Sequence, residues 1–184
     1  MVFKISILKQ NIAKMILKLS ITGILTALFF CHSSYAAVPP LTGPKVDKVI
    51  VVKSKRVMML LNNSRIIRTY RIALGKQPVG LKVRQGDHKT PEGSYTLVSR
   101  NPNSSYHLSI KISYPNEYDA KYAKKIGVPP GGEIMIHGLP QGLGDLGELH
   151  RRWDWTDGCI AVTNSEMDEI WQLVSDGTPI EIMP

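Results

Sequence analysis

The hydrophobic positions of this chain fall mostly into short runs that predict β-strands rather than helices. Seven runs are rich in apolar or β-branched residues and are bounded by turn-forming residues: 49–52, 57–61, 66–74, 94–99, 107–112, 134–136 and 179–182. The first three follow one another closely and predict a β-meander. The chain is therefore expected to have a mainly-β fold.

Two segments carry helical patterns, and both are short. Apolar residues recur at helical spacing near the C-terminus, at Met167, Ile170, Trp171 and Val174. Ser165 and Asp168 predict a capping box at the start of this helix, and Gly177 predicts its stop. A small mid-chain helix is expected within 116–126. The glycine-rich segment 75–93 reads as a loop and lacks the Gly-Lys-Ser/Thr ending of a phosphate-binding loop.

The first 36 residues have the pattern of a secretory signal peptide. Four lysines without any acidic residue accompany a mostly apolar run, 19–31, which is short for a membrane span. Small residues at Ser34 and Ala36 fit a cleavage site after position 36. We therefore expect export to the periplasm or cell envelope. An uncleaved membrane anchor is the alternative.

Setting residues 1–36 aside changes the composition. The remaining 148 residues comprise a proline-rich leader, 37–46, and one domain, 47–184. Half of the net charge of +8 belongs to the four lysines of residues 1–36, so +4 remains, from 19 basic and 15 acidic residues. That mild charge suits an anionic envelope polymer. No basic stripe interleaved with aromatic residues points to nucleic acid. Of the two cysteines, only Cys159 remains.

A lone cysteine in an exported domain calls for an explanation, and a nearby histidine suggests one. A thiol attacks a carbonyl as the thiolate, and an imidazole oriented through its other nitrogen can accept the proton. His137 ends the predicted strand 134–136, and Cys159 lies 22 positions later. The chain between them must fold back for the two to meet. A buried, inert cysteine with a structural histidine is the alternative.

The residues before Cys159 favour a nucleophile. In Thr156-Asp157-Gly158, a glycine directly precedes the thiol, where backbone N–H groups can face a developing oxyanion. Arg151 and Arg152 lie slightly upstream. They either bind a substrate carboxylate or are solvated loop charges.

Metal binding is a further alternative. Four side chains of this region could supply zinc ligands: His137, His150, Asp157 and Cys159. Their spacing fits no common zinc signature, so we expect neither a metal nor another cofactor. His150 is otherwise expected to be an exposed or stacked loop residue. His88 and His107 are expected to be structural or solvent-facing.

Three motifs of the chain are similar to those of a known family. They are Thr-Pro-Glu-Gly-Ser-Tyr at 90–95, Ile-Met-Ile-His-Gly at 134–138 and Thr-Asp-Gly-Cys-Ile at 156–160. In this order they resemble the catalytic domain of the L,D-transpeptidases, the YkuD-like family of peptidoglycan enzymes. The resemblance covers roughly residues 47–183.

The resemblance implies a β-sandwich-like fold and a set of roles. Cys159 would be the nucleophile and His137 its base, oriented by the backbone carbonyl of Gly138. The N–H groups of Gly158 and Cys159, together with Asp157, would form the oxyanion hole. Thr156, beside them, is a candidate substrate contact.

One position departs from the family pattern. The family most often has Ser/Thr-His-Gly-Cys, whereas Asp157 replaces that histidine here. A carboxylate beside the thiol raises the thiol pKa by like-charge repulsion, so His137, Arg151 or Arg152 would have to compensate. Asp157 could instead bind the ammonium group of a diamino acid.

The resemblance implies acyl transfer on peptidoglycan stem peptides. The nucleophile would attack the bond between the diamino acid at position three and D-Ala at position four. An amine acceptor would then complete a wall cross-link or the attachment of a lipoprotein. Two alternatives remain: a hydrolase on the same scaffold, trimming stems or releasing a wall-linked protein, and a non-catalytic peptidoglycan-binding module.

Overall fold

Residues 45–184 are described by a computed structural model, so the expected signal peptide and most of the leader lie outside the described part. Eight strands form the domain: β1 (Lys48–Val52), β2 (Val57–Asn62), β3 (Arg65–Arg71), β4 (Gly93–Ser104), β5 (His107–Ile112), β6 (Met135–His137), β7 (Ile160–Ala161) and β8 (Pro179–Met183). The helical elements are η1 (Lys53–Lys55), α2 (Glu117–Lys125), η2 (Gly144–Arg152) and α3 (Asn164–Leu173). Within 45–184, no helix is long and apolar enough to span a membrane.

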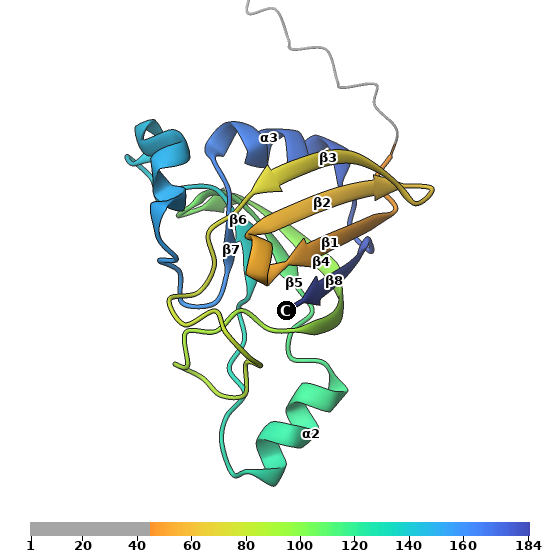
Figure 1. The fold of residues 1–184 in the computed structure, drawn as a ribbon, viewed down its shortest axis with the longest axis vertical. Coiled ribbons are helices and arrows are strands. Elements are labelled where there is room, and N and C mark those ends of the chain that lie inside the picture. The colour runs from red at the N-terminus through yellow and green to blue at the C-terminus, as the bar shows by residue number, and fades with distance from the viewer. Residues whose placement is uncertain (1–44) are drawn as a thin grey trace, which may run out of the picture. The chain divides into compact units, whose positions relative to one another are not determined.

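All eight strands belong to one curled sheet (Figure 1), ordered β3-β2-β1-β8-β4-β5-β6-β7. Neighbouring strands are antiparallel except for two parallel pairs, β1 with β8 and β6 with β7. Strands β1, β2 and β3 form the expected meander. The prediction of a mainly-β fold with few helices is confirmed.

The two ends of this sheet are joined by backbone hydrogen bonds. Ala73, just after β3, donates to the carbonyl of Ala161 at 3.0 Å, and the Ala161 N–H donates back at 2.9 Å. A further bridge pairs Gly75 with Thr156. The sheet therefore curls until its first and last strands meet, and strand β7, only two residues long, is bonded on both sides.

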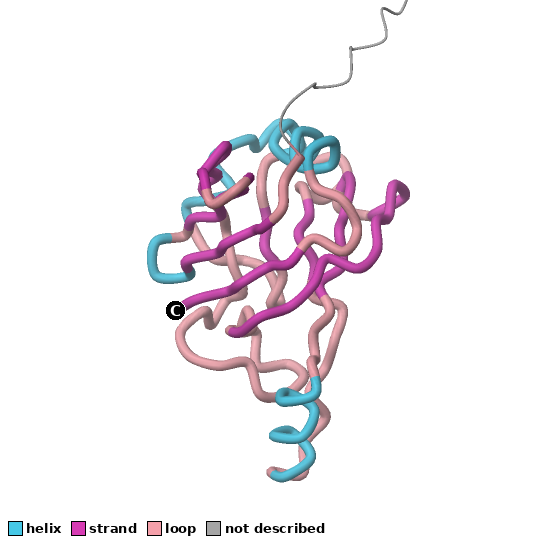
Figure 2. The backbone as a smooth tube through the Cα atoms, turned by 90° about the vertical axis from the view of Figure 1, so that its right-hand side faces the viewer, coloured by secondary structure: helices cyan, strands magenta, loops and turns pink. Residues whose placement is uncertain are grey.

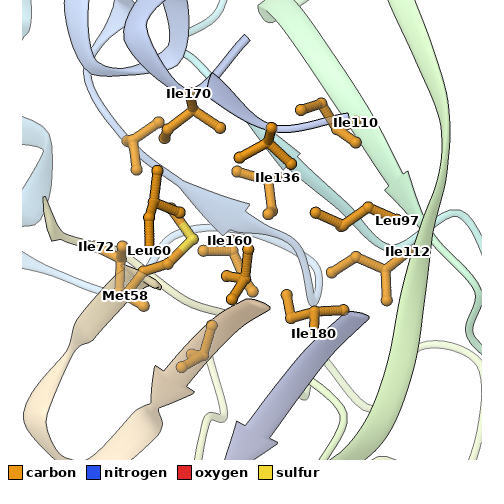
Figure 3. Close-up of a cluster of buried hydrophobic side chains, with 14 of the residues drawn as sticks. Met58, Leu60, Ile72, Leu97, Ile110, Ile112, Ile136, Ile160, Ile170 and Ile180 are labelled. Carbon is orange, nitrogen blue, oxygen red and sulfur yellow. The ribbon is translucent and has the colours of Figure 1, made fainter. Parts of the chain in front are cut away.

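The core lies inside this curl and is built from alternate residues of the strands. Figure 3 shows side chains from strands far apart in the sequence converging on a single cluster, which Ile170 of α3 covers. The following are almost fully buried: Met58, Leu60, Leu97, Ile110, Ile112, Ile136, Ile160 and Ile180. Alternation fixes which side of each strand faces outward, and the outward side of β6 and β7 carries the site.

Two strand boundaries differ from the sequence prediction. Strand β3 ends at Arg71 instead of continuing to Leu74, because the chain leaves β2 there and pairs with β7. Strand β4 continues to Ser104, well past the predicted end at position 99. Its polar outer half lies beyond the core and is held by backbone pairing with β5. This part of the strand therefore has no hydrophobic pattern from which the sequence could predict it.

The predicted capping box of the C-terminal helix was wrong by two residues. The N-cap of α3 is Thr163, whose hydroxyl accepts from the Glu166 N–H while the Glu166 carboxylate accepts from the Thr163 N–H. Ser165 and Asp168 lie inside the helix. The helix ends at Leu173, before Gly177.

This cap assignment predicts unequal effects of two alanine substitutions. Thr163→Ala removes the capping hydroxyl and should lower the free energy of unfolding by about 1 kcal/mol. Ser165→Ala removes a hydroxyl of similar size from inside the helix and should change stability by less than about 0.5 kcal/mol. Urea denaturation of both variants measures the difference. A larger loss for Ser165→Ala would contradict the assignment.

Candidate active site

Cys159 and His137 reach the same face of the sheet through the pairing of β6 with β7. Ile136 lies opposite Ile160 in this parallel pair, and both isoleucines are fully buried. Alternation along the strands therefore turns Cys159 and His137 outward. Strand spacing and rise put their Cα atoms about 8 Å apart, a gap that the two side chains can span.

His137 is buried and held in one orientation. Its Nδ1 lies 2.7 Å from the backbone oxygen of Gly138, and because a carbonyl can only accept, Nδ1 carries the proton. The Nε2 lone pair of the neutral ring is then free to accept a proton. Burial lowers the pKa of His137 below 6.5, outweighing the hydrogen bond to Gly138, which raises it. The ring is therefore a neutral base at pH 7.

Two aromatic rings enclose His137. The Tyr106 ring lies 4.5 Å from the imidazole centroid, and the Trp155 ring meets it edge-on at 5.7 Å. Together they wall a cavity of about 370 Å³ that also reaches Cys159. They fix the plane of the imidazole and keep its surroundings dry, which is the source of the lowered pKa.

The thiol of Cys159 is neutral in this environment. Burial raises its pKa above 9.0; the Met135 N–H lowers it, and the charges of Asp157 and Glu133 raise it further. The Sγ atom donates a weak hydrogen bond, at 3.5 Å, to the backbone oxygen of Glu133. Glu133 has a left-handed backbone with φ of 55°, an uncommon conformation for glutamate that aims this carbonyl at the sulfur.

A hydroxyl inside the Thr-Asp-Gly-Cys turn holds the backbone around Cys159. Thr156 Oγ1 accepts from the Gly158 N–H at 3.1 Å and donates to the carbonyl of Cys159 at 2.8 Å. Gly158 has a φ of +132°, and a Cβ there would lie 2.7 Å from the Lys89 carbonyl. One expectation is corrected as a result: the Gly158 N–H is already bonded to Thr156, so it is not a free oxyanion donor. The buried Thr156 hydroxyl holds the turn, and because Thr156 also lines the cavity beside Tyr106 and Trp155, its substrate contact stays a prediction.

Asp157 is exposed and has two side-chain partners that the sequence did not suggest, a lysine and a histidine. Its Oδ1 lies 2.9 Å from Lys76 Nζ and 2.9 Å from His88 Nδ1, with 74% of the side chain exposed. The hydrogen bond from Lys76 is the main cause that lowers the Asp157 pKa. The predicted repulsion of the thiolate by Asp157 is present, and Lys82, rather than Arg151 or Arg152, is the cation that lowers the Cys159 pKa. Lys76 and His88 act on Asp157 itself, by bonding to its carboxylate.

Two cavities meet at Cys159. The smaller one lies on the His137 side. The larger, of about 760 Å³, is walled by the 82–88 loop and by residues 129–134. Glu133, Asp157 and Cys159 line both cavities, so the thiol lies at the neck between them with one carboxylate on each side.

Three predicted residues lie away from this neck. Arg151 is mostly buried and forms ion pairs with Glu166 and Glu148, which fasten η2 to the start of α3. Arg152 is exposed, and neither arginine lines the cavities at Cys159, so of the two alternatives the structure does not support the substrate contact. His150 is buried, not exposed. Its Nδ1 accepts from Trp155 Nε1 at 3.4 Å, and burial is the main cause lowering its pKa, to about 4.

The zinc alternative finds no support in the described residues. Between positions 45 and 184, no three His, Cys, Asp or Glu side chains are grouped so that they could hold a metal ion. His150, one of the four residues of that alternative, lines a separate apolar cavity with Trp153 and Leu146.

Sequence reasoning missed four residues of the site: Lys76, His88, Tyr106 and Glu133. Each lies in a loop or tight turn whose residues follow no hydrophobic period. His88 was expected to be structural or solvent-facing, but it borders the larger cavity and contacts Asp157. Only the folded chain brings these residues to Cys159.

Comparison with known proteins identifies relatives of this domain. YafK of Escherichia coli K12, provisionally named an L,D-transpeptidase, is 36% identical over 114 residues, covering 60% of this chain and 38% of YafK. Among solved structures, the helical cell shape determining protein Pgp2 of Campylobacter jejuni is 29% identical with a TM-score of 0.57, covering 76% of this chain and 47% of Pgp2. Bd1075 of Bdellovibrio bacteriovorus is 29% identical with a TM-score of 0.53, covering 76% and 48%. The chain thus spans less than half the length of each relative.

The family match covers almost the whole described domain. Residues 47–182 match the YkuD family, the L,D-transpeptidase catalytic domain. The motifs that suggested the resemblance all lie within this range, and the curled sheet is shared with the structural relatives. The chain belongs to the YkuD family of L,D-transpeptidase catalytic domains.

Proposed function

We propose that this protein is a cysteine acyltransferase acting on peptidoglycan stem peptides. One observation carries the proposal: the thiol of Cys159 and the free Nε2 of a buried, oriented His137 face the same cavity. A neutral imidazole beside a neutral thiol is suited to take the proton as the sulfur attacks a carbonyl.

In the first half-reaction, His137 Nε2 takes the thiol proton while Sγ attacks the carbonyl carbon of the diamino acid at stem position three. The N–H of Cys159 is the oxyanion donor we assign, because the Gly158 N–H is bonded to Thr156. The tetrahedral intermediate collapses, the C–N bond to D-Ala breaks, and His137 returns the proton to the departing amine. A thioester remains on Cys159.

In the second half-reaction, an amine attacks the thioester, gives a proton to His137 and leaves an amide, and the thiolate then takes that proton back. The acceptor amine belongs to a second stem peptide or to a wall-attached lipoprotein. If water takes the place of the amine, the same residues release a carboxylate, and the protein acts as a carboxypeptidase or amidase.

The position of His137 suggests which part of the substrate each of the two cavities holds. The departing and the incoming amine must both lie within reach of Nε2, so both use the smaller cavity beside Tyr106 and Trp155. The acyl peptide then extends into the larger cavity. Asp157, at the neck, is placed to meet the ammonium group of the diamino acid with its exposed carboxylate.

The nucleophile is tested on purified disaccharide-tetrapeptide, with products identified by mass. The wild-type protein should give cross-linked dimers, and Cys159→Ala and His137→Gln should give none. His107→Gln is the matched histidine control, because that side chain bonds to Asp168 on α3, and it should keep full turnover. Full turnover by Cys159→Ala would refute the mechanism, and trimmed tripeptide without dimers would select the hydrolase.

The pH dependence follows from the neutral resting pair. Activity requires His137 unprotonated, so kcat/KM should fall as the pH drops through the His137 pKa. Since burial lowers that pKa, the fall should lie below pH 6.5. A pH profile on the tetrapeptide measures it. An acid limb at or above pH 6.5 would contradict the lowered pKa of His137.

The charges around Asp157 are tested on the thiol itself, without substrate. Asp157→Asn removes a like charge and should lower the Cys159 pKa, whereas Lys76→Met exposes that charge and should raise it. The double variant should lie near the wild type. The pH dependence of iodoacetamide alkylation reports each pKa. If the Cys159 pKa moved in the same direction in both single variants, the idea that Lys76 offsets the charge of Asp157 would be wrong.

A further inference from the structure

Helix α2 contributes almost nothing to the core. It begins with a complete capping box, Asn116 with Asp119, and Ala123 is its one buried residue. Figures 1 and 2 both place it at one end of the domain, outside the sheet. A helix of nine residues is marginal by itself in water, so this one depends on its cap and on its few contacts with the domain.

The exposed side of α2 carries two stacked tyrosines. The rings of Tyr118 and Tyr122 lie 6.5 Å apart between centroids and are inclined by only 16°, so their planes are nearly parallel and the stacked pair forms an aromatic platform. Tyr118 is 69% exposed and Tyr122 is 42% exposed. Large aromatic side chains are normally buried or placed at contact surfaces, so this pair needs a partner to account for it.

Two lysines border the same platform. At about 100° per residue, Lys121 and Lys125 fall on the side of the helix that carries the tyrosines. The Glu117 carboxylate lies 3.8 Å from Lys121, and both side chains are more than 80% exposed, so this pairing leaves most of the positive charge in place. Asp119 points away, to the hydroxyl of Tyr95 at 3.0 Å. We call Tyr118, Lys121, Tyr122 and Lys125 the Tyr–Lys face.

The Tyr–Lys face is connected directly to the larger cavity. The Val128 N–H, just after the helix, bonds to the carbonyl of Ala123 at 3.0 Å. The next residues, 129–134, form one wall of that cavity, and Pro129 accepts a bond of 2.8 Å from the Gln85 N–H of the opposite wall. The segment that leaves α2 therefore becomes one wall of the larger cavity.

We propose that the Tyr–Lys face binds the glycan strand of peptidoglycan, an inference that rests on the proposed function. The apolar C–H face of a pyranose ring fits the negative face of an aromatic ring, so successive sugars stack on Tyr118 and Tyr122. Lys121 and Lys125 pair with carboxylates of the stem peptides that the strand carries. A membrane fits this face less well, because Ile126 is the one exposed aliphatic side chain beside it.

The test is co-sedimentation of the complete protein with purified peptidoglycan sacculi. Tyr118→Ser/Tyr122→Ser should bind about tenfold more weakly, while Tyr118→Phe/Tyr122→Phe keeps the stack and should bind as the wild type does. Lys121→Gln/Lys125→Gln should weaken binding chiefly at low salt. The control is Leu143→Ser/Leu149→Ser, which removes two exposed apolar side chains, one just before η2 and one within it, and should leave binding unchanged.

Two further measurements separate this surface from the catalytic site and from a membrane. Turnover of soluble disaccharide-tetrapeptide should be the same in the serine variant as in the wild type. If neither the wild type nor any variant turned over the substrate while sacculus binding was intact, the proposed acyltransferase activity would be refuted, but the proposed glycan-binding surface would not. Equal sedimentation of the serine variant and the wild type would overturn the proposal. So would tyrosine-dependent binding to phosphatidylglycerol vesicles in place of sacculi.

Discussion

The pair of backbone hydrogen bonds between Ala73 and Ala161 is the constraint on which the candidate active site depends. It bonds the free side of β7, a strand too short to be stable as an open edge. It also carries the chain that follows, the loop 75–93, against the Thr156–Cys159 turn. Cys159, its turn and the residues that surround it are therefore positioned by one closure of the sheet.

This closure determines the electrostatics of the site. Burial leaves both the thiol and the imidazole of His137 neutral, which suits a base that acts only when a substrate carbonyl is present. An aspartate beside the thiol would work against that chemistry if it were unpaired. Lys76 and His88, delivered by the loop, bond to the Asp157 carboxylate and allow it to occupy the position where the family most often has histidine.

The sequence predicted the elements whose side chains follow a regular period. The strands of the meander and the C-terminal helix bury alternate or helically spaced residues, and this burial is visible in the order of apolar positions. The prediction failed where backbone bonds act without a hydrophobic pattern, as in the outer half of β4. It also failed at the helix cap, because two Ser/Thr and acidic pairs with the same spacing lie close together and only Thr163 precedes the first turn.

By itself the sequence determined the mainly-β fold, the family, and the choice of Cys159 and His137 as the candidate nucleophile and base, since these follow from local pattern and residue type. Tertiary structure decided which N–H groups are free, where Arg151 and His150 lie, and which side chains bond to Asp157. These features depend on contacts between residues distant in the chain. Such contacts are set by how the sheet closes and how its loops pack, and they produce no periodic pattern of apolar residues from which they could be predicted.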